Sequence, residues 1–195
     1  MPVVAPPSLG ALVASYSPAQ RRTVEAALGL FAHHGVGGTS LQMIADALGV
    51  TKAAVYHQFP TKDAIVVATL EVQLLPIEEL LERVQTDEPE GSNARNARDA
   101  LLAGLVDAVV ANRRSLSTLQ SDPVLFRLLA EHPPSLSLWT RVFGILLGDD
   151  ADHRALVRAS VLSAVIGSVA YPFVIDLDGD TLRDELLQVL HRILL

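Results

Sequence analysis

The stretch TSLQMIADALGVTKAAVYHQFPTK, residues 39–62, holds two short helical patterns separated by Gly49. A helix-turn-helix needs a small residue where its helices cross and a residue that tolerates positive φ in the turn. Ala45 meets the first need and Gly49 the second. The apolar positions that would fix the crossing are Ile44, Leu48, Val50 and Val55. The stretch therefore predicts a helix-turn-helix.

The second helix of this motif would turn a polar face outward. That face consists of Thr51, Lys52, Ala53, Tyr56 and His57. Short side chains let a helix enter the major groove of DNA, and the longer ones supply donors for phosphates and base edges. The alternative is an ordinary helical hairpin with a solvated polar face, but the combination of turn, spacing and donors favours DNA binding.

Separate roles can be predicted within this face. We expect Tyr56 and Lys62 to hold phosphates, with Lys62 assisted by the amides of the helix that begins near Thr61. The side chains expected in the groove are those of Thr51, Lys52 and His57. Thr39 and Ser40, where the motif begins, complete the predicted DNA-binding set.

Capping signals place the helices around the motif. Ser17–Gln20 reads as a capping box with proline at the first helical position, and the helix it opens ends at Gly35. Thr39–Gln42 reads as a second capping box, while Thr51 and Thr61 are expected to cap the next two helices.

The rest of the chain is predicted to be helical, with no alternating strand pattern of useful length. Loops are expected at 87–93 and 176–180, where Asp, Gly and Pro gather. The predicted helices are 62–86 (kinked or broken at Pro76), 93–112, 113–120, 122–131, 134–147, 151–174 and 180–194.

The charge is unevenly spread along the 195 residues, which carry a net −7. Residues 1–70 hold four basic and three acidic side chains, a balance of +1, so the remainder carries −8. Only one end of such a protein is suited to meet DNA.

Several function classes lack support. The chain has no cysteine, and its six histidines show no metal-ligand spacing, so neither a metal site nor a cofactor is expected. No catalytic motif is present, which argues against an enzyme. The uncharged run at 159–175 is too short and too polar for a confident membrane span. The N-terminus lacks the basic region of a secretion signal, so we expect a cytoplasmic protein.

Residues 31–70, FAHHGVGGTSLQMIADALGVTKAAVYHQFPTKDAIVVATL, closely resemble the N-terminal domain of the TetR family of bacterial transcriptional repressors. One departure is Gln58, where many members carry His before the Phe. The matching positions are Phe31, Gly35, Thr39, Ser40, Ile44, Ala45, Gly49, Val50, Thr51, Ala54, Val55, Tyr56, Phe59 and Lys62.

The resemblance implies an all-α homodimer that binds double-stranded operator DNA and is released by a small effector. It implies a three-helix DNA-binding domain, which we place at 18–61. The prolines at the start of the chain separately predict a flexible tail at 1–17. A larger helical bundle at 62–195 would bind the effector and the second subunit. An activator, or an architectural dimer that needs no ligand, is the alternative.

Two predictions concern the bundle. Helices 151–174 and 180–194 are expected to form the dimer interface, because the first is rich in small residues and the second is unusually apolar; the alternative is that both pack within their own subunit. A hydrophobic or amphipathic effector would lie among apolar side chains that could equally be ordinary core. These are Leu105, Val109, Leu116, Leu119, Phe126, Trp139, Phe143 and Tyr171.

Overall fold

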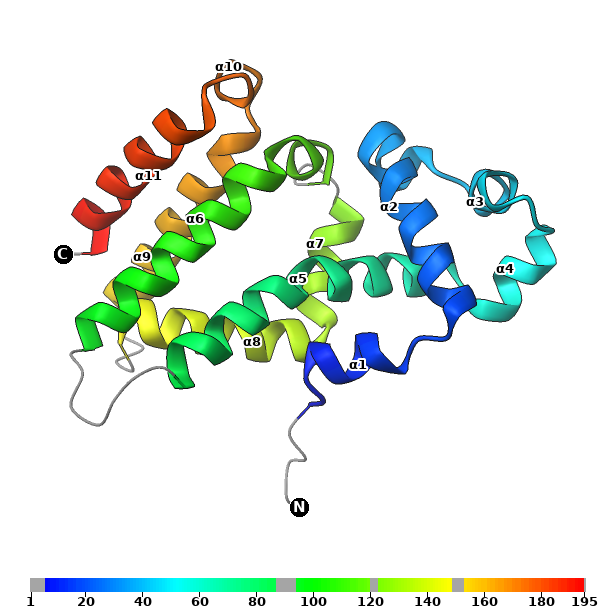
Figure 1. Ribbon diagram of the computed structural model, residues 1–195, viewed down its shortest axis with the longest axis horizontal. Helices are drawn as coiled ribbons and strands as arrows, with labels where there is room; N and C mark the ends of the chain where they lie inside the picture. Colours follow the sequence, from blue (N-terminus) through cyan, green and yellow to red (C-terminus); the bar gives the residue numbers. More distant parts are fainter. Residues whose placement is uncertain (1–5, 87–93, 120–122, 149–152, 195) are drawn as a thin grey trace. The chain divides into compact units, whose positions relative to one another are not determined.

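The computed structural model describes residues 6–86, 94–119, 123–148 and 153–194, and throughout these ranges the regular structure is helical (Figure 1). This confirms the predicted all-α class. The helices are α1 (Leu9–Ser15), α2 (Pro18–Gly38), α3 (Leu41–Leu48), α4 (Lys52–Gln58), α5 (Lys62–Thr86), α6 (Ala94–Leu119), α7 (Pro123–Glu131), α8 (Pro133–Leu147), α9 (His153–Gly167), the 3-10 turn η1 (Ser168–Ala170), α10 (Pro172–Ile175) and α11 (Gly179–Leu194).

The chain divides into two compact units. Unit 1 comprises residues 1–75 and 118–137, and unit 2 comprises 76–117 and 138–195. The division falls within α5, at Pro76, and not at the boundary expected near residue 62. The helix itself runs on through Pro76, so of the kink or break expected there the break is wrong.

Unit 1 is built around one apolar core. Phe31 of α2, Ile44 of α3 and Ile65 of α5 are fully buried in it, and Val55 of α4 is nearly so. Figure 1 shows α2, α3 and α4 grouped around the N-terminal half of α5. Each short helix contributes its few apolar side chains to this core, which gives helices of seven and eight residues a stability that they would lack alone.

Residues 1–17 are not a flexible tail as far as the structure describes them. Ser8 caps α1 by accepting a hydrogen bond from the amide of Ala11. Leu9 is fully buried, and the Arg21 guanidinium donates to the carbonyls of Ala14 and Tyr16 at the end of α1. The prediction failed because the prolines at the start of the chain do not extend into α1, a short helix that Leu9 and Arg21 hold in place.

The predicted caps are confirmed with one exception. Ser17 and Gln20 form both bonds of a capping box at the start of α2, and Thr51 and Thr61 accept from the amides of Ala54 and Ala64. The cap of α3 is Ser40, which accepts from the amide of Met43. The capping box predicted for Thr39 and Gln42 is wrong, because these two side chains bond elsewhere.

Three other helix predictions differ from the structure. Helix α2 continues to Gly38 past Gly35, whose φ of 70° and ψ of 165° kink it. The two helices expected over 93–112 and 113–120 are one helix, α6. Conversely, the single helix expected over 151–174 divides into α9, η1 and α10, consistent with the helix-breaking effect of Pro172.

In unit 2, α9 packs against α11, and an ion pair joins α11 to α6. The Arg183 guanidinium of α11 lies 2.6 Å from the Asp107 carboxylate of α6. Arg113 of α6 donates to the carbonyls of Ile175 and Leu177, which fixes the turn before α11. Close packing also joins the second half of α5 to α6, since a Cβ added at Gly104 would lie 2.5 Å from the Leu80 side chain.

None of the helices in the described ranges is both long enough and apolar enough to cross a membrane.

Candidate nucleic-acid interface

The turn between α3 and α4 has the geometry that the sequence predicts. Gly49 adopts the left-handed conformation, with φ 65° and ψ 32°, which a side chain would strain. Its amide and that of Val50 donate to carbonyls at the end of α3, so that the helix closes in a hydrogen-bonded turn. Ala45 is fully buried, as expected for the small residue at the crossing.

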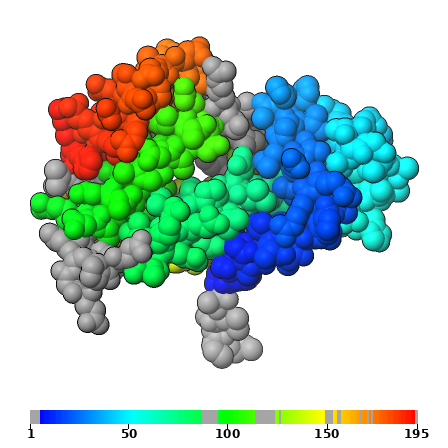
Figure 2. Space-filling model, in the orientation of Figure 1, coloured from blue at the N-terminus to red at the C-terminus, as the bar shows by residue number. Residues whose placement is uncertain are grey.

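Helix α4 presents the predicted face to solvent. Thr51, Lys52, Ala53, Tyr56 and His57 are all exposed, while Val55 on the opposite side is buried. Figure 2 shows α3 and α4 forming an open part of the surface of unit 1. The Lys52 ammonium lies 5.7 Å from the centre of the Tyr56 ring, within the range of a cation–π contact. The positive charge and the phenol hydroxyl therefore lie close together on this face.

The two residues predicted at the start of the motif differ in position. Ser40 is exposed at the N-terminus of α3, where its hydroxyl already caps the helix. Thr39 is only 2% exposed, and its hydroxyl donates to the Gly35 carbonyl 2.8 Å away. The structure therefore argues against a side-chain contact between Thr39 and DNA: this hydroxyl stabilises the kinked end of α2.

Lys62 has a structural role that sequence reasoning missed. Its ammonium donates to the carbonyls of Val36 and Thr39, at 2.9 and 3.2 Å. These carbonyls belong to the end of α2, which carries a partial negative charge. Lys62 thus ties the start of α5 to the α2–α3 junction, and a phosphate contact would have to share the same ammonium group.

Gln58 also proves to be structural. Its side-chain oxygen lies 3.3 Å from the Ser17 hydroxyl, and its carbonyl accepts from the Gln20 amide at the same distance. Its side-chain nitrogen lies 3.4 Å from His57 Nδ1. The last residue of α4 therefore contacts the capping box of α2. Sequence reasoning could find the box but not the residue that docks on it.

The side chains proposed for an effector site lie in different environments. Leu105 and Val109 are buried along α6, and Trp139 stacks on Phe143 of α8 with ring centres 5.9 Å apart. Tyr171 is 56% exposed and stacks on Phe173 at the surface. The side chains of Leu116, Leu119 and Phe126 lie outside the described part of the chain. Among the candidates whose side chains are described, two thus lie in the core, two form a half-buried stack and one lies at the surface.

Comparison with known proteins supports the assignment of the motif. A model of the family described as "Bacterial regulatory proteins, tetR family" matches residues 24–69, which span most of α2 through the first turns of α5. No curated protein sequence matches the chain.

Solved structures of similar fold cover almost the whole chain. A tetR-family regulatory protein from Rhodococcus RHA1 is 22% identical, with 91% of this chain and 97% of that chain covered and a TM-score of 0.63. NalD of Pseudomonas aeruginosa, described as the secondary repressor of the MexAB-OprM multidrug efflux pump, is 25% identical, with 89% and 94% covered and a TM-score of 0.65. A transcriptional regulator from Aquifex aeolicus is 17% identical, with 90% and 99% covered and a TM-score of 0.65.

The turn at Gly49, the exposed donor face of α4 and the family match over residues 24–69 converge on one conclusion. Residues 24–69 form a domain that matches the tetR family of bacterial regulatory proteins, and the chain as a whole has the fold of solved transcriptional regulators of that family.

Proposed function

We propose that the protein is a dimeric repressor whose two α4 helices bind the half-sites of a palindromic operator and which a hydrophobic ligand releases. The exposed face of α4 carries the DNA-binding part of this proposal. A single helix of seven residues offers few phosphate and base contacts. Useful affinity therefore calls for two copies that bind two half-sites at once.

Exposed apolar side chains in unit 2 support the dimer. Val157 and Val161, one turn apart on α9, are 62% and 40% exposed. Further along the chain, the rings of Tyr171 and Phe173 stack on each other, and Phe173 is 80% exposed. Leu177 and Val189 add further exposed apolar groups near and on α11. Such groups gather where a second protein surface covers them, and two-fold pairing of like surfaces is the commonest arrangement.

The ligand part of the proposal rests on α6 and α8. The Trp139–Phe143 stack is half-buried in unit 2, and α6 contributes buried leucine and valine side chains to the core of the same unit. Aromatic and aliphatic side chains with few charges among them suit contact with a hydrophobic or amphipathic molecule. Repression, in preference to activation, is favoured by the likeness to NalD, whose description is that of a repressor.

Selection from a random duplex library with the full chain tests the DNA-binding proposal. We expect an inverted repeat with half-sites about one helical turn apart, bound by two copies of the chain. The affinity should fall steeply as the salt concentration rises, because each phosphate contact releases counterions. Retention of random duplex as tightly as the selected one would contradict the proposal.

Trp139 provides a direct probe of the ligand site, because it is the only tryptophan of the chain. We expect the hydrophobic dye 8-anilinonaphthalene-1-sulfonate to quench its emission and to lower the affinity for the selected duplex. The coupling must be reciprocal, so the duplex should weaken dye binding by the same factor. Quenching without any effect on DNA binding would favour the ligand-independent alternative.

A further inference from the structure

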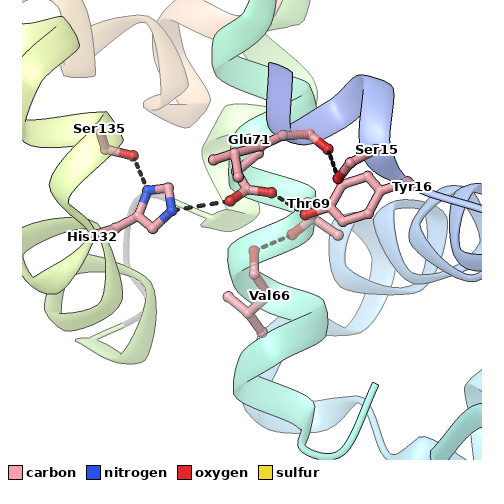
Figure 3. A network of polar contacts seen from close by, with 8 residues as sticks. Ser15, Tyr16, Val66, Thr69, Glu71, His132 and Ser135 are labelled. Carbon is pink, nitrogen blue, oxygen red and sulfur yellow. Dashed lines mark hydrogen bonds and ion pairs between the residues drawn. The ribbon is translucent and has the colours of Figure 1, made fainter. Parts of the chain in front are cut away.

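A polar network inside unit 1 joins three separate parts of the chain. At its centre is Glu71 of α5, which is 4% exposed (Figure 3). One carboxylate oxygen accepts a hydrogen bond from the Tyr16 hydroxyl, and the other lies 3.0 Å from His132 Nε2. His132 Nδ1 in turn lies 2.8 Å from the hydroxyl of Ser135, in the first turn of α8. The network thus connects the α1–α2 linker, α5 and the α7–α8 turn.

Burial makes these contacts obligatory. A carboxylate taken out of water loses its hydration, so Glu71 is stable only while Tyr16 and His132 supply donors. Burial, and then the bond to Glu71, raises the pKa of Tyr16 above its ordinary value. The hydroxyl therefore keeps its proton at neutral pH and remains a donor to Glu71. A displacement of any one member leaves a buried polar group unpaired.

The α1–α2 linker also contacts α4. The Tyr16 ring meets the ring of Phe59 edge-on, with centres 6.1 Å apart. Phe59 is buried and closes α4, since its amide donates to the Val55 carbonyl. The next linker residue, Ser17, is the one whose hydroxyl meets Gln58. Tyr16 and Ser17 thus hold the last residue of α4 and the residue that follows it.

Helix α4 depends on such contacts for its orientation. A seven-residue helix cannot fix its own direction, and Val55 is its only buried side chain. A binding site functions when its side chains are held within about 0.5 Å of their working positions. His57 lies one residue before Gln58, so a small movement of the linker would be carried directly to a residue expected in the groove.

We propose that Tyr16 and Glu71 are positioning residues for DNA recognition, and that they couple the α7–α8 turn at His132 to the end of α4. This inference rests on the proposed contact of α4 with DNA. It adds a route from α8 to α4 that passes through the α1–α2 linker, outside the residues matched by the family model. Changes at the α7–α8 turn should therefore alter how the protein reads DNA, although no residue of that turn belongs to the DNA-binding set.

Tyr16→Phe is the sharpest test, because it keeps the ring on Phe59 and removes only the donor to Glu71. The probe is the duplex that the wild-type chain selects from a random library. We expect the affinity for this duplex to fall about 3- to 10-fold, within the range of known couplings, while affinity for random duplex stays unchanged. The matched control is Ser15→Ala, whose hydroxyl bonds only to the nearby Leu12 carbonyl, and which should bind like wild type.

Substitutions at His132 test the far end of the network. His132→Leu should lower the affinity for the selected duplex by a similar factor, whereas His132→Gln, which keeps an N–H for Glu71, should restore much of it. The double variant Tyr16→Phe/His132→Leu should lose less than the product of the single losses, because both act on Glu71.

A purely structural network would give a different pattern. The variants would then unfold at lower temperature, yet each would bind the selected duplex as tightly as wild type, and Gln would show no advantage over Leu at residue 132. That pattern would overturn the coupling alone. A wild-type chain that selects no duplex would overturn the proposed function and this inference together.

Discussion

Helix α4 and the α9–α11 region both expose apolar or aromatic side chains, but these exposed groups differ in kind. On α4 the exposed Tyr56 stands beside Lys52, Thr51 and His57, so its surroundings are rich in donors. On α9 the exposed Val157 and Val161 carry no polar atom, and Phe173 stacks only on another ring. A donor face suits phosphates and base edges, whereas a face of valine and phenylalanine suits protein.

The removal of one phenylalanine from each unit should have the largest and most unequal effects on stability. Phe31→Ala should lower the free energy of unfolding by about 3–5 kcal/mol, because this ring is fully buried in unit 1. Phe173→Ala should change it by less than about 0.5 kcal/mol in dilute protein, as for other surface positions. Its effect should grow with protein concentration if the ring lies between two copies. Urea denaturation at two protein concentrations measures both.

A charge placed on α9 tests whether its exposed valines lie in the dimer interface. Val157→Glu should convert the dimer to a monomer and lower the affinity for the selected duplex by about 100-fold or more, since two linked half-site contacts become one. Analytical ultracentrifugation and DNA titration measure the two effects. Ala111→Glu, at an exposed position of α6, is the control. A Val157→Glu protein that remains dimeric would place the interface elsewhere.

Two glycines distinguish a packed position from an open one. Gly104→Ala should lower the free energy of unfolding by about 1–3 kcal/mol, because the new methyl group would press on Leu80. Gly29→Ala, with no atom within 4 Å of the new methyl group, should raise it by about 0.5–1 kcal/mol. Equal effects at the two sites would show that α5 and α6 are not closely packed there. The same contact means that a large side chain at residue 104 would disrupt packing, and would not fill a ligand cavity.

The smallest expected effect concerns alkaline pH. The pKa of Tyr16 is raised above the ordinary 10.0, so the folded chain holds this proton more tightly than the unfolded chain. The resulting stability is present below about pH 10 and is lost as the pH rises further. Between pH 8 and 11 the wild type should therefore lose stability more steeply than Tyr16→Phe. Parallel curves for the two proteins would mean that Tyr16 is not buried against Glu71.

Sequence was sufficient for the parts of unit 1 that local chemistry determines. Gly49 predicted a turn with positive φ, and Ser17, Thr51 and Thr61 predicted helix caps, as the structure has them. Each of these signals involves residues within four positions of one another. The exposed face of α4 follows from the same short-range periodicity, because Val55 alone faces the core.

Contacts between distant residues lay beyond sequence reasoning. The bonds of Lys62 to Val36 and Thr39, of Gln58 to Ser17, and of Glu71 to His132 join residues 23 to 61 positions apart. No periodic pattern marks such partners, since each depends on how whole helices pack. Helix α1 was not predicted for the same reason. It is held by the burial of Leu9 in the core and by the bonds of Arg21 on α2, and both contacts depend on how the helices pack.

Lys52 is the one lysine on the exposed face of α4, and the proposal that α4 reads the operator depends most directly on it. The decisive measurement is the ratio of the affinities for the selected duplex and for a scrambled duplex of equal length, in wild type and in Lys52→Ala at one salt concentration. A base-edge contact is worth about 1–3 kcal/mol of discrimination, so the ratio should fall by roughly 5- to 150-fold. An unchanged ratio in a folded, dimeric Lys52→Ala protein would contradict the claim that α4 reads the operator.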